Sequence, residues 1–200
     1  MVLKLSDVAQ RPDLLTSEFV LPTKENVVFR PLSHEDAPKL AQFLENLSPQ
    51  TRIFYVLDGY DLATAREMCR AINRYDKLRF VLLEKATGQF IALVEYSFDI
   101  PESDTERFLQ YDIHLSQGSD CRIGPCISDA FQDRKVGTAL FPLLINVARQ
   151  FGQKHMILWG GVFADNERAV AFYEKNGFTR VGTSTTKDGK ELIDMMIAIE

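Results

Sequence analysis

The hydrophobic pattern of this 200-residue chain changes repeatedly between the two-residue period of strands and the 3.6-residue period of helices. No internal repeat or low-complexity tract interrupts the succession. Strand-like and helix-like segments that follow one another are typical of an α/β domain. The pattern therefore predicts a mixed α/β fold, and the chain is long enough to bury a sizeable core in one domain.

Turn residues divide the chain into segments whose apolar periods predict individual elements. The expected strands cover residues 26–31, 80–83, 90–96, 111–115, 122–127, 156–159, 179–186 and 193–199. The expected helices cover residues 33–47, a stretch from 51, 62–73, a stretch carrying 140–151, and 166–176. The acidic segment 99–107 predicts turns in a solvated loop. We expect residues 1–25, whose pattern is unclear, to be an N-terminal extension and residues 26–200 to be a single domain.

The charge balance and the cysteine content argue against several classes of function. The chain has 23 basic and 28 acidic residues and no long block of Lys and Arg, so nucleic acid is not expected as a principal partner. The first thirty residues lack an apolar signal core and no run reaches about 18 apolar residues, which predicts a soluble, unprocessed protein without membrane contact. The three cysteines have no CxxC spacing, which predicts neither disulfides nor a metal site and suits a reducing cytoplasm.

Residues 127–138 lie between an expected strand and an expected helix, and they suit an anion. Backbone N–H groups in the first turn of a helix are unpaired donors at the positive end of its dipole. Gly137 would let a phosphate approach the backbone closely, so a pyrophosphate is the expected ligand. An ordinary strand-to-helix turn with solvated charges is the alternative.

A second informative segment runs from Asn166 to Phe178. Asn166 is a good N-cap, and Ala169 and Tyr173 follow it on the same helical face. Gly177 suits the end of the helix. Taken singly, these residues are a cap, a half-buried aromatic and a terminator, but together they form a specific pattern.

In this order and spacing, the two segments resemble the acyl-CoA motif and the following helix of the GNAT superfamily of N-acyltransferases, over residues 26–199. The family's turn Gln/Arg-x-x-Gly-x-Gly/Ala aligns with Gln132–Gly137. Lys135 stands at the first glycine, so the turn there has a negative φ or holds a left-handed residue at a cost of about 1 kcal/mol or more. The family pattern Asn-x-x-Ala-x-x-Phe-Tyr-x-Lys-x-Gly-Phe is met residue by residue from Asn166 to Phe178.

The resemblance implies a mixed, mostly antiparallel, splayed central sheet with helices on both faces. The family's sheet opens between its fourth and fifth strands, which here would part Arg122–Ile127 from Met156–Trp159. Pro142 lies within the helix after the turn, where it is expected to kink or delay the helix at a cost of about 3 kcal/mol. The donors expected to bind the pyrophosphate precede Pro142.

The resemblance also implies acetyl-CoA as co-substrate, without a metal. The residues implied for binding it are Cys126, Ile127, Ser128, Gln132, Asp133, Arg134, Lys135, Val136, Gly137, Thr138, Asn166 and Phe172. Asn166 is expected to hydrogen-bond the pantetheine arm, and Tyr173 to face the thioester sulfur. The implied reaction is direct attack of a primary amine on the thioester, with Tyr173 protonating the leaving thiolate.

An alkyl amine has a pKa of about 10.4, so a group on the protein or a water must accept its proton. The catalytic candidate is Glu95, which falls outside the apolar alternation of its strand, with Asp112 and His114 as alternatives. The acidic segment 99–107 is a candidate for attracting cationic acceptors. Cys126 is also a candidate nucleophile, but it has no evident His partner, which favours a structural role.

Two other classes of function stay open. A catalytically silent CoA-binding module for regulation or interaction would retain the fold without turnover, which the departures at Lys135 and Pro142 make conceivable. A purely structural interaction domain would make the second segment a coincidence. The sequence assigns no acceptor, whether a small molecule or a protein amine, and leaves a homodimer open.

Overall fold

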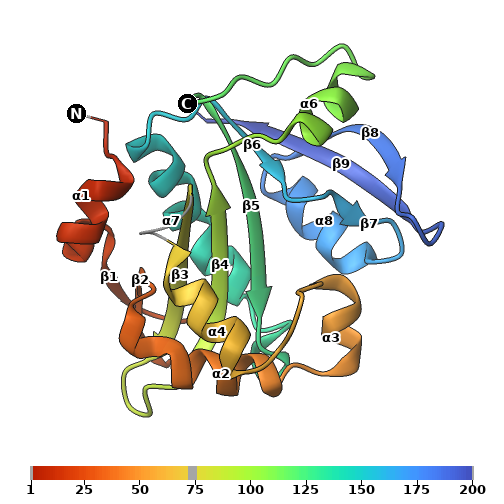
Figure 1. Ribbon diagram of the computed structural model, residues 1–200. Helices are drawn as coiled ribbons and strands as arrows, with labels where there is room; N and C mark the ends of the chain where they lie inside the picture. Colours follow the sequence, from red (N-terminus) through yellow and green to blue (C-terminus); the bar gives the residue numbers. More distant parts are fainter. Residues whose placement is uncertain (1, 72–75, 200) are drawn as a thin grey trace. The chain divides into compact units, whose positions relative to one another are not determined.

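The computed structural model describes residues 2–71 and 76–199, with the elements labelled in Figure 1. These elements fall into two units. The N-terminal unit comprises Leu3–Glu95 and Pro125–Leu140, and the C-terminal unit comprises Met1–Val2, Tyr96–Gly124 and Phe141–Glu200. Strands β4 (Phe90–Ser97) and β5 (Asp120–Ile127) and helix α7 (Val136–Gln150) have residues in both units. One domain over residues 26–200, preceded by an extension, stays a prediction.

Four strands of the N-terminal unit follow one another in the order β1-β2-β3-β4. β1 (Ser17–Val20) pairs antiparallel with β2 (Asn26–Pro31), and β2 pairs antiparallel with β3 (Lys77–Glu84). The strands expected at residues 26–31, 80–83 and 90–96 are confirmed. β1 was not expected, because only the pairing with β2 distinguishes its four residues from a loop.

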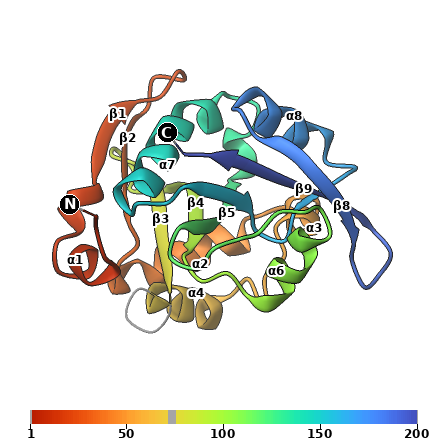
Figure 2. The ribbon, with the colours of Figure 1, turned by 90° about the horizontal axis from the view of Figure 1, so that it is seen from above.

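The helices of the N-terminal unit are α1 (Leu5–Gln10), α2 (Ala37–Glu45), α3 (Pro49–Phe54) and α4 (Leu62–Cys69), with short 3-10 turns η1 (Pro12–Leu15) and η2 (His34–Asp36). Figure 2 shows α2 and α4 on the same side of β3 and β4. The expected apolar face of α2 is buried there, with Leu40, Phe43, Leu44 and Leu47 in one core cluster with Val81 and Leu93. The expected helix end at Asn73 lies outside the described residues.

The C-terminal unit carries strands in the order β5-β6-β9-β7, with β8 also paired to β9. These are β6 (His155–Leu158), β7 (Val162–Phe163), β8 (Thr179–Thr185) and β9 (Glu191–Ala198). β5 and β6 are parallel, whereas β9 pairs antiparallel with β6, β7 and β8. A mixed, mostly antiparallel sheet with helices is therefore confirmed, as are the C-terminal hairpin and helix α8 (Glu167–Lys175).

The separation of β5 from β6 starts later than expected. The two strands stay paired from Asp120↔His155 to Ile123↔Leu158, and the Trp159 N–H donates to the Ile123 carbonyl at 2.9 Å. β6 ends there because the following glycines, Gly160 and Gly161, have φ of 74° and 79°, outside the strand region. The prediction that Arg122–Ile127 and Met156–Trp159 part is therefore wrong for Arg122 and Ile123, which pair with Ile157 and Leu158.

The expected turns at 99–107 and strand at 111–115 are also wrong. The first region contains α6 (Glu102–Leu109), which buries Asp104 and Phe108 on one face. Tyr111 follows in a turn, where its ring leaves no room for a Cβ on Gly182, which would lie 2.2 Å from the ring. Asp112 then takes a φ of 58°, which is incompatible with a strand.

Helix α7 continues from Val136 to Gln150 through Pro142. Pro142 and the residue four positions before it, Thr138, are both exposed. Water can therefore hydrogen-bond the Thr138 carbonyl that Pro142 leaves without a helical donor. Among residues 2–71 and 76–199, no helix combines the length and the apolar run that crossing a membrane requires.

Candidate functional site

The turn between β5 and α7 has an unusual backbone. After η3 (Asp129–Phe131), Asp133 has a φ of 59° and Lys135 a φ of 61°. Of the two conformations expected for Lys135, the structure has the left-handed one. A non-glycine residue there costs about 1–2 kcal/mol relative to the right-handed region. Strain of this kind is often found at ligand-binding turns, which makes this turn a candidate site.

Unpaired backbone donors follow Lys135 directly. The Ala139 N–H makes the first intrahelical bond, to the Lys135 carbonyl at 3.1 Å. The N–H groups of Val136, Gly137 and Thr138 therefore have no acceptor within α7. A left-handed residue followed by a helical one turns successive N–H groups toward one concave space, which suits an anion at the positive end of this 15-residue helix.

The side chains of the turn partly brace it from within. Gln132 Nε2 donates to the Ile127 carbonyl and to Thr51 Oγ1, both at 3.0 Å. Arg134 pairs with Glu25 at 3.2 Å and lies over the Phe131 ring. Lys135 is exposed, and Arg134 keeps about two fifths of its side-chain surface in solvent, at 41%. Both cations are thus accessible to an anion at the turn.

The last residues of β5 have different environments. Cys126 is buried in the core cluster of the N-terminal unit, and this burial raises the pKa of its thiol well above the ordinary value. A thiol that stays protonated is a poor nucleophile, so the structure favours the structural role of Cys126. The Ser128 N–H donates to the Ile91 carbonyl at 2.9 Å, and the Ile127 carbonyl accepts from Gln132. The role of Cys126, Ile127 and Ser128 toward pantetheine stays a prediction.

Glu95 is buried on β4, with 7% of its surface exposed. Its Oε1 lies 2.5 Å from Arg79 Nε, and its Oε2 accepts a hydrogen bond from the Tyr55 hydroxyl at 2.6 Å. Burial, and then the charge of Glu95, raise the pKa of Tyr55 well above its ordinary value, so the phenol keeps its proton. Both oxygens of the candidate base are therefore occupied within the N-terminal unit.

The sequence prediction missed Arg79 and Tyr55. Arg79 stands between two fully buried residues of β3, Leu78 and Phe80. A charged residue among buried strand neighbours requires a charged partner, and Glu95 on the adjacent strand was the available signal. Nothing local marks Tyr55, because its partner lies 40 residues further along the chain.

In the C-terminal unit, α8 carries the second segment. Asn166 Oδ1 accepts from the Ala169 N–H at 3.2 Å, so this side chain caps the helix as expected. Tyr173 packs edge-on against Phe172 and Phe178, with ring centroids 5.3 and 5.2 Å apart. Phe141 from α7 completes the cluster, 6.2 Å from both phenylalanines. Phe172 and Phe178 therefore hold the Tyr173 ring in place.

The other proton acceptors considered, Asp112 and His114, are exposed in the segment after α6. The acidic residues before them are not all solvated. Asp104 is buried and forms ion pairs with Arg107 at 2.8 Å and Arg122 at 3.3 Å. A solvated loop is thus the wrong description of this region, and Asp104 is not available to attract a cationic acceptor.

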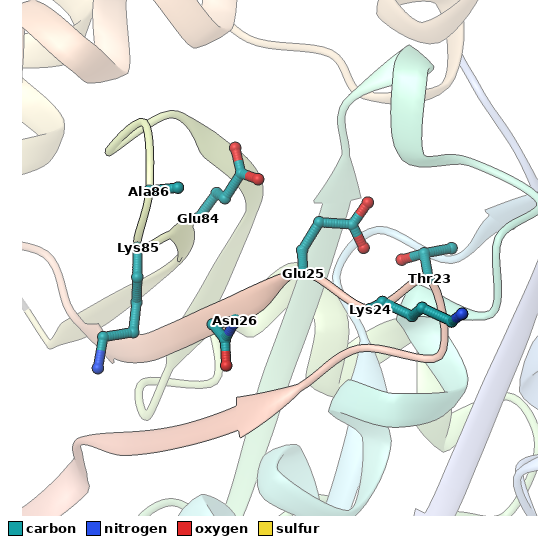
Figure 3. Close-up of a pocket in the computed structure, with 7 residues that line it drawn as sticks. All are labelled: Thr23, Lys24, Glu25, Asn26, Glu84, Lys85 and Ala86. Atoms are coloured by element: carbon teal, nitrogen blue, oxygen red, sulfur yellow. The ribbon is translucent and has the colours of Figure 1, made fainter.

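A cavity of about 530 Å³ lies in the N-terminal unit, beside the turns before β2 and after β3. Figure 3 shows the side chains that line it. Its lining residues are Thr23, Lys24, Glu25, Asn26, Glu84, Lys85 and Ala86. The side chains of Lys24 and Lys85 point apart (Figure 3), and Lys85 pairs with Glu18, which is not part of the lining. The lining holds two lysines and two glutamates, and one of them, Glu25, links it to the turn through its ion pair with Arg134.

A mixed sheet, a donor-rich turn before α7 and the Asn166–Phe178 pattern on α8 are the features that the resemblance to the GNAT superfamily implied. A model of the Acetyltransferase (GNAT) family matches residues 41–178, a stretch that contains both segments. The chain belongs to this family. An acetyltransferase of Pseudomonas aeruginosa is 28% identical over 131 residues, which span 66% of this chain and 64% of the relative.

Solved structures of the same fold include three acetyltransferases. The GNAT domain of S. lividans PAT has a TM-score of 0.69 at 21% identity, over 94% of this chain and 98% of that one. The ribosomal-protein-S5-alanine acetyltransferase from Vibrio fischeri has a TM-score of 0.71 at 12% identity, over 92% and 97%. The aminoglycoside acetyltransferase AAC(6')-Ib, solved with coenzyme A and kanamycin, has a TM-score of 0.64 at 20% identity, over 86% and 94%.

Proposed function

We propose that the protein transfers an acetyl group from acetyl-CoA to a primary amine of its acceptor by direct attack. The observation that carries the proposal is the turn before α7, where left-handed Lys135 precedes the N–H groups of Val136, Gly137 and Thr138, which have no acceptor within the helix. These donors, with the exposed cations of Arg134 and Lys135, fit the pyrophosphate of a CoA ester. When bound, acetyl-CoA supplies the activated thioester.

Side chains of the protein would donate and accept the protons of the reaction. The Tyr173 phenol, held by Phe172 and Phe178, would protonate the leaving thiolate. Glu95 would accept the amine proton through the Tyr55 hydroxyl or a water, because both of its oxygens are occupied by Arg79 and Tyr55. Because Asn166 Oδ1 caps the helix, its side-chain NH₂ group would be the one that hydrogen-bonds the pantetheine arm.

The occupied oxygens of Glu95 also favour a second candidate, a catalytically silent module that binds CoA. Release of CoA thiol in the presence of any amine would exclude it. A screen of chemically diverse amines should include aminoglycosides and peptides with an N-terminal alanine, the acceptors that the names of the solved relatives suggest. The three free, buried cysteines suit a reducing cytoplasm as the place of action.

Acetyl-CoA is expected to stabilise the protein by mass action. At a concentration of about 100 times its Kd, the gain is about 2.7 kcal/mol, which raises the Tm of a chain of this size by about 5–10 °C. Differential scanning calorimetry measures the shift. Pantetheine is the control and should stabilise much less, because it lacks the pyrophosphate. If titration calorimetry detects no binding at millimolar acetyl-CoA, the acetyltransferase proposal fails.

Lys135→Gly should separate backbone strain from charge. Glycine takes a positive φ without steric cost, so the free energy of unfolding should stay unchanged or rise by about 1 kcal/mol. Loss of one exposed cation should weaken acetyl-CoA binding about two- to fivefold and flatten its salt dependence. Lys135→Gln keeps the strain and should lose affinity without gaining stability. Equal affinity in all three proteins would show that the ammonium makes no contribution.

A further inference from the structure

Asp129 joins two segments of the N-terminal unit that are far apart in the sequence. Its Oδ2 accepts from the Ser48 N–H at 2.9 Å, and its Oδ1 accepts from the hydroxyls of Ser48 and of Thr51, the latter at 2.7 Å. Thr51 Oγ1 in turn accepts from Gln132 Nε2 at 3.0 Å. The start of α3 is therefore tied to the turn that holds Lys135.

The carboxylate form of Asp129 is the one that makes these bonds. Burial raises the pKa of Asp129, but hydrogen bonds donated by Ser48 and Thr51 outweigh it and leave the pKa below its ordinary value. The group is therefore ionised at neutral pH and acts only as an acceptor. Hydrogen bonds to a charged acceptor are stronger than those between neutral groups, and Asp129 accepts them at the solvent-exposed surface.

Polar connections act at both ends of helix α3. None of its six residues is fully buried, and Tyr55, which follows them, packs against the core cluster of the N-terminal unit. At its far end, Tyr55 donates to Glu95, and the Tyr60 hydroxyl donates to the Tyr55 carbonyl at 2.6 Å. The helix thus lies between Asp129 at its start and Glu95 at its end.

We propose that Asp129 is a positioning residue that couples occupation of the turn 132–135 to the placement of α3, and through Tyr55 to Glu95. The inference rests on the proposed function, because it takes the turn as the site for the CoA pyrophosphate. Acetyl-CoA that orders the turn would restrict the positions of Gln132 and Asp129. Gln132 is hydrogen-bonded to Thr51, and Asp129 to both Thr51 and Ser48, so these residues at the start of α3 would be restricted as well. Co-substrate binding would then set the position of the proton acceptor before the amine reacts.

Hydrogen exchange of the α3 backbone tests the coupling without knowledge of the acceptor. In the wild-type protein, saturating acetyl-CoA should slow exchange of the amides of residues 50–55 by about 5- to 150-fold. In Asp129→Asn, one oxygen becomes an NH₂ group that faces the Ser48 and Thr51 donors. This variant should still bind acetyl-CoA within about tenfold but slow the same amides less than about twofold.

Two variants at Thr51 test the same hydrogen-bonded connection from its α3 end. Thr51→Val removes the hydroxyl at nearly constant shape and should weaken the acetyl-CoA effect on α3, because only the Ser48 bonds to Asp129 remain, whereas Thr51→Ser should keep it. Asp188→Asn, in the exposed β8–β9 turn, is the matched control and should behave as wild type.

The outcomes distinguish the two proposals. If the wild-type protein does not bind acetyl-CoA, the proposed function and this inference both fail. If it binds but exchange in α3 does not change, or if Asp129→Asn and Thr51→Val respond as strongly as wild type, the coupling alone is overturned. Because Thr51→Val leaves the loop carboxylate intact, a folding defect of Asp129→Asn does not prevent the decision.

Discussion

Replacing Tyr173 by phenylalanine is expected to lower turnover by about 10²- to 10⁴-fold and to leave acetyl-CoA affinity within a small factor. A tyrosine phenol has a pKa of about 10 and is protonated near neutrality, whereas a thiolate's conjugate acid has a pKa of about 8.5. The phenol therefore has a proton to donate. Packing against Phe172 and Phe178 involves the ring alone, so phenylalanine should keep its position.

Pre-steady-state measurement of thiol release, under conditions where chemistry limits the rate, checks this prediction. A drop of only about tenfold would still support the role, because water can replace a phenol toward a fair leaving group. Tyr111→Phe is the matched control: its hydroxyl bonds Asp194 and the Thr183 carbonyl and has no proposed role in turnover. A Tyr173→Phe enzyme as fast as wild type would leave Tyr173 as a core aromatic.

Asp194→Ala is expected to lower the free energy of unfolding by about 3–5 kcal/mol. Asp194 is fully buried on β9, where Arg107 Nε lies 3.1 Å from both of its oxygens and the Tyr111 hydroxyl donates at 3.0 Å. Alanine would leave the partly buried Arg107 guanidinium with Asp104 as its remaining ion-pair partner, shared with Arg122. An uncompensated charge away from water is the largest part of the expected cost.

Urea unfolding followed by circular dichroism measures the loss. Tyr111→Phe removes one hydrogen bond from the same carboxylate and should cost about 1 kcal/mol. A second reference, Asp188→Ala in the exposed β8–β9 turn, should change stability by less than about 0.5 kcal/mol. A loss below about 1 kcal/mol for Asp194→Ala would mean that water or a shift of Arg107 compensates the missing charge.

The sequence by itself determined the elements whose signals are local. The second segment specifies its own helix, because the cap of Asn166, the apolar face and the terminating Gly177 all act within one stretch of chain. The Asp188-Gly189 turn likewise specifies the C-terminal hairpin, since Gly189 adopts a φ of 85°. The resemblance carried by these residues was sufficient to predict the family.

Only the tertiary structure decided which polar residues are partners. The acidic sequence of α6 is typical of a solvated loop. Only the fold shows that its carboxylate Asp104 is buried and pairs with Arg122 on β5. Glu95 looked like a free candidate base, yet Tyr55 and Arg79 occupy its oxygens. The ties of Asp129 to Ser48 and Thr51 cross about 80 residues, as separations of 81 and 78 show. Hydrogen bonds and ion pairs over such distances leave no periodic trace in a sequence, because any chain position of suitable chemistry can supply the partner once packing brings it near.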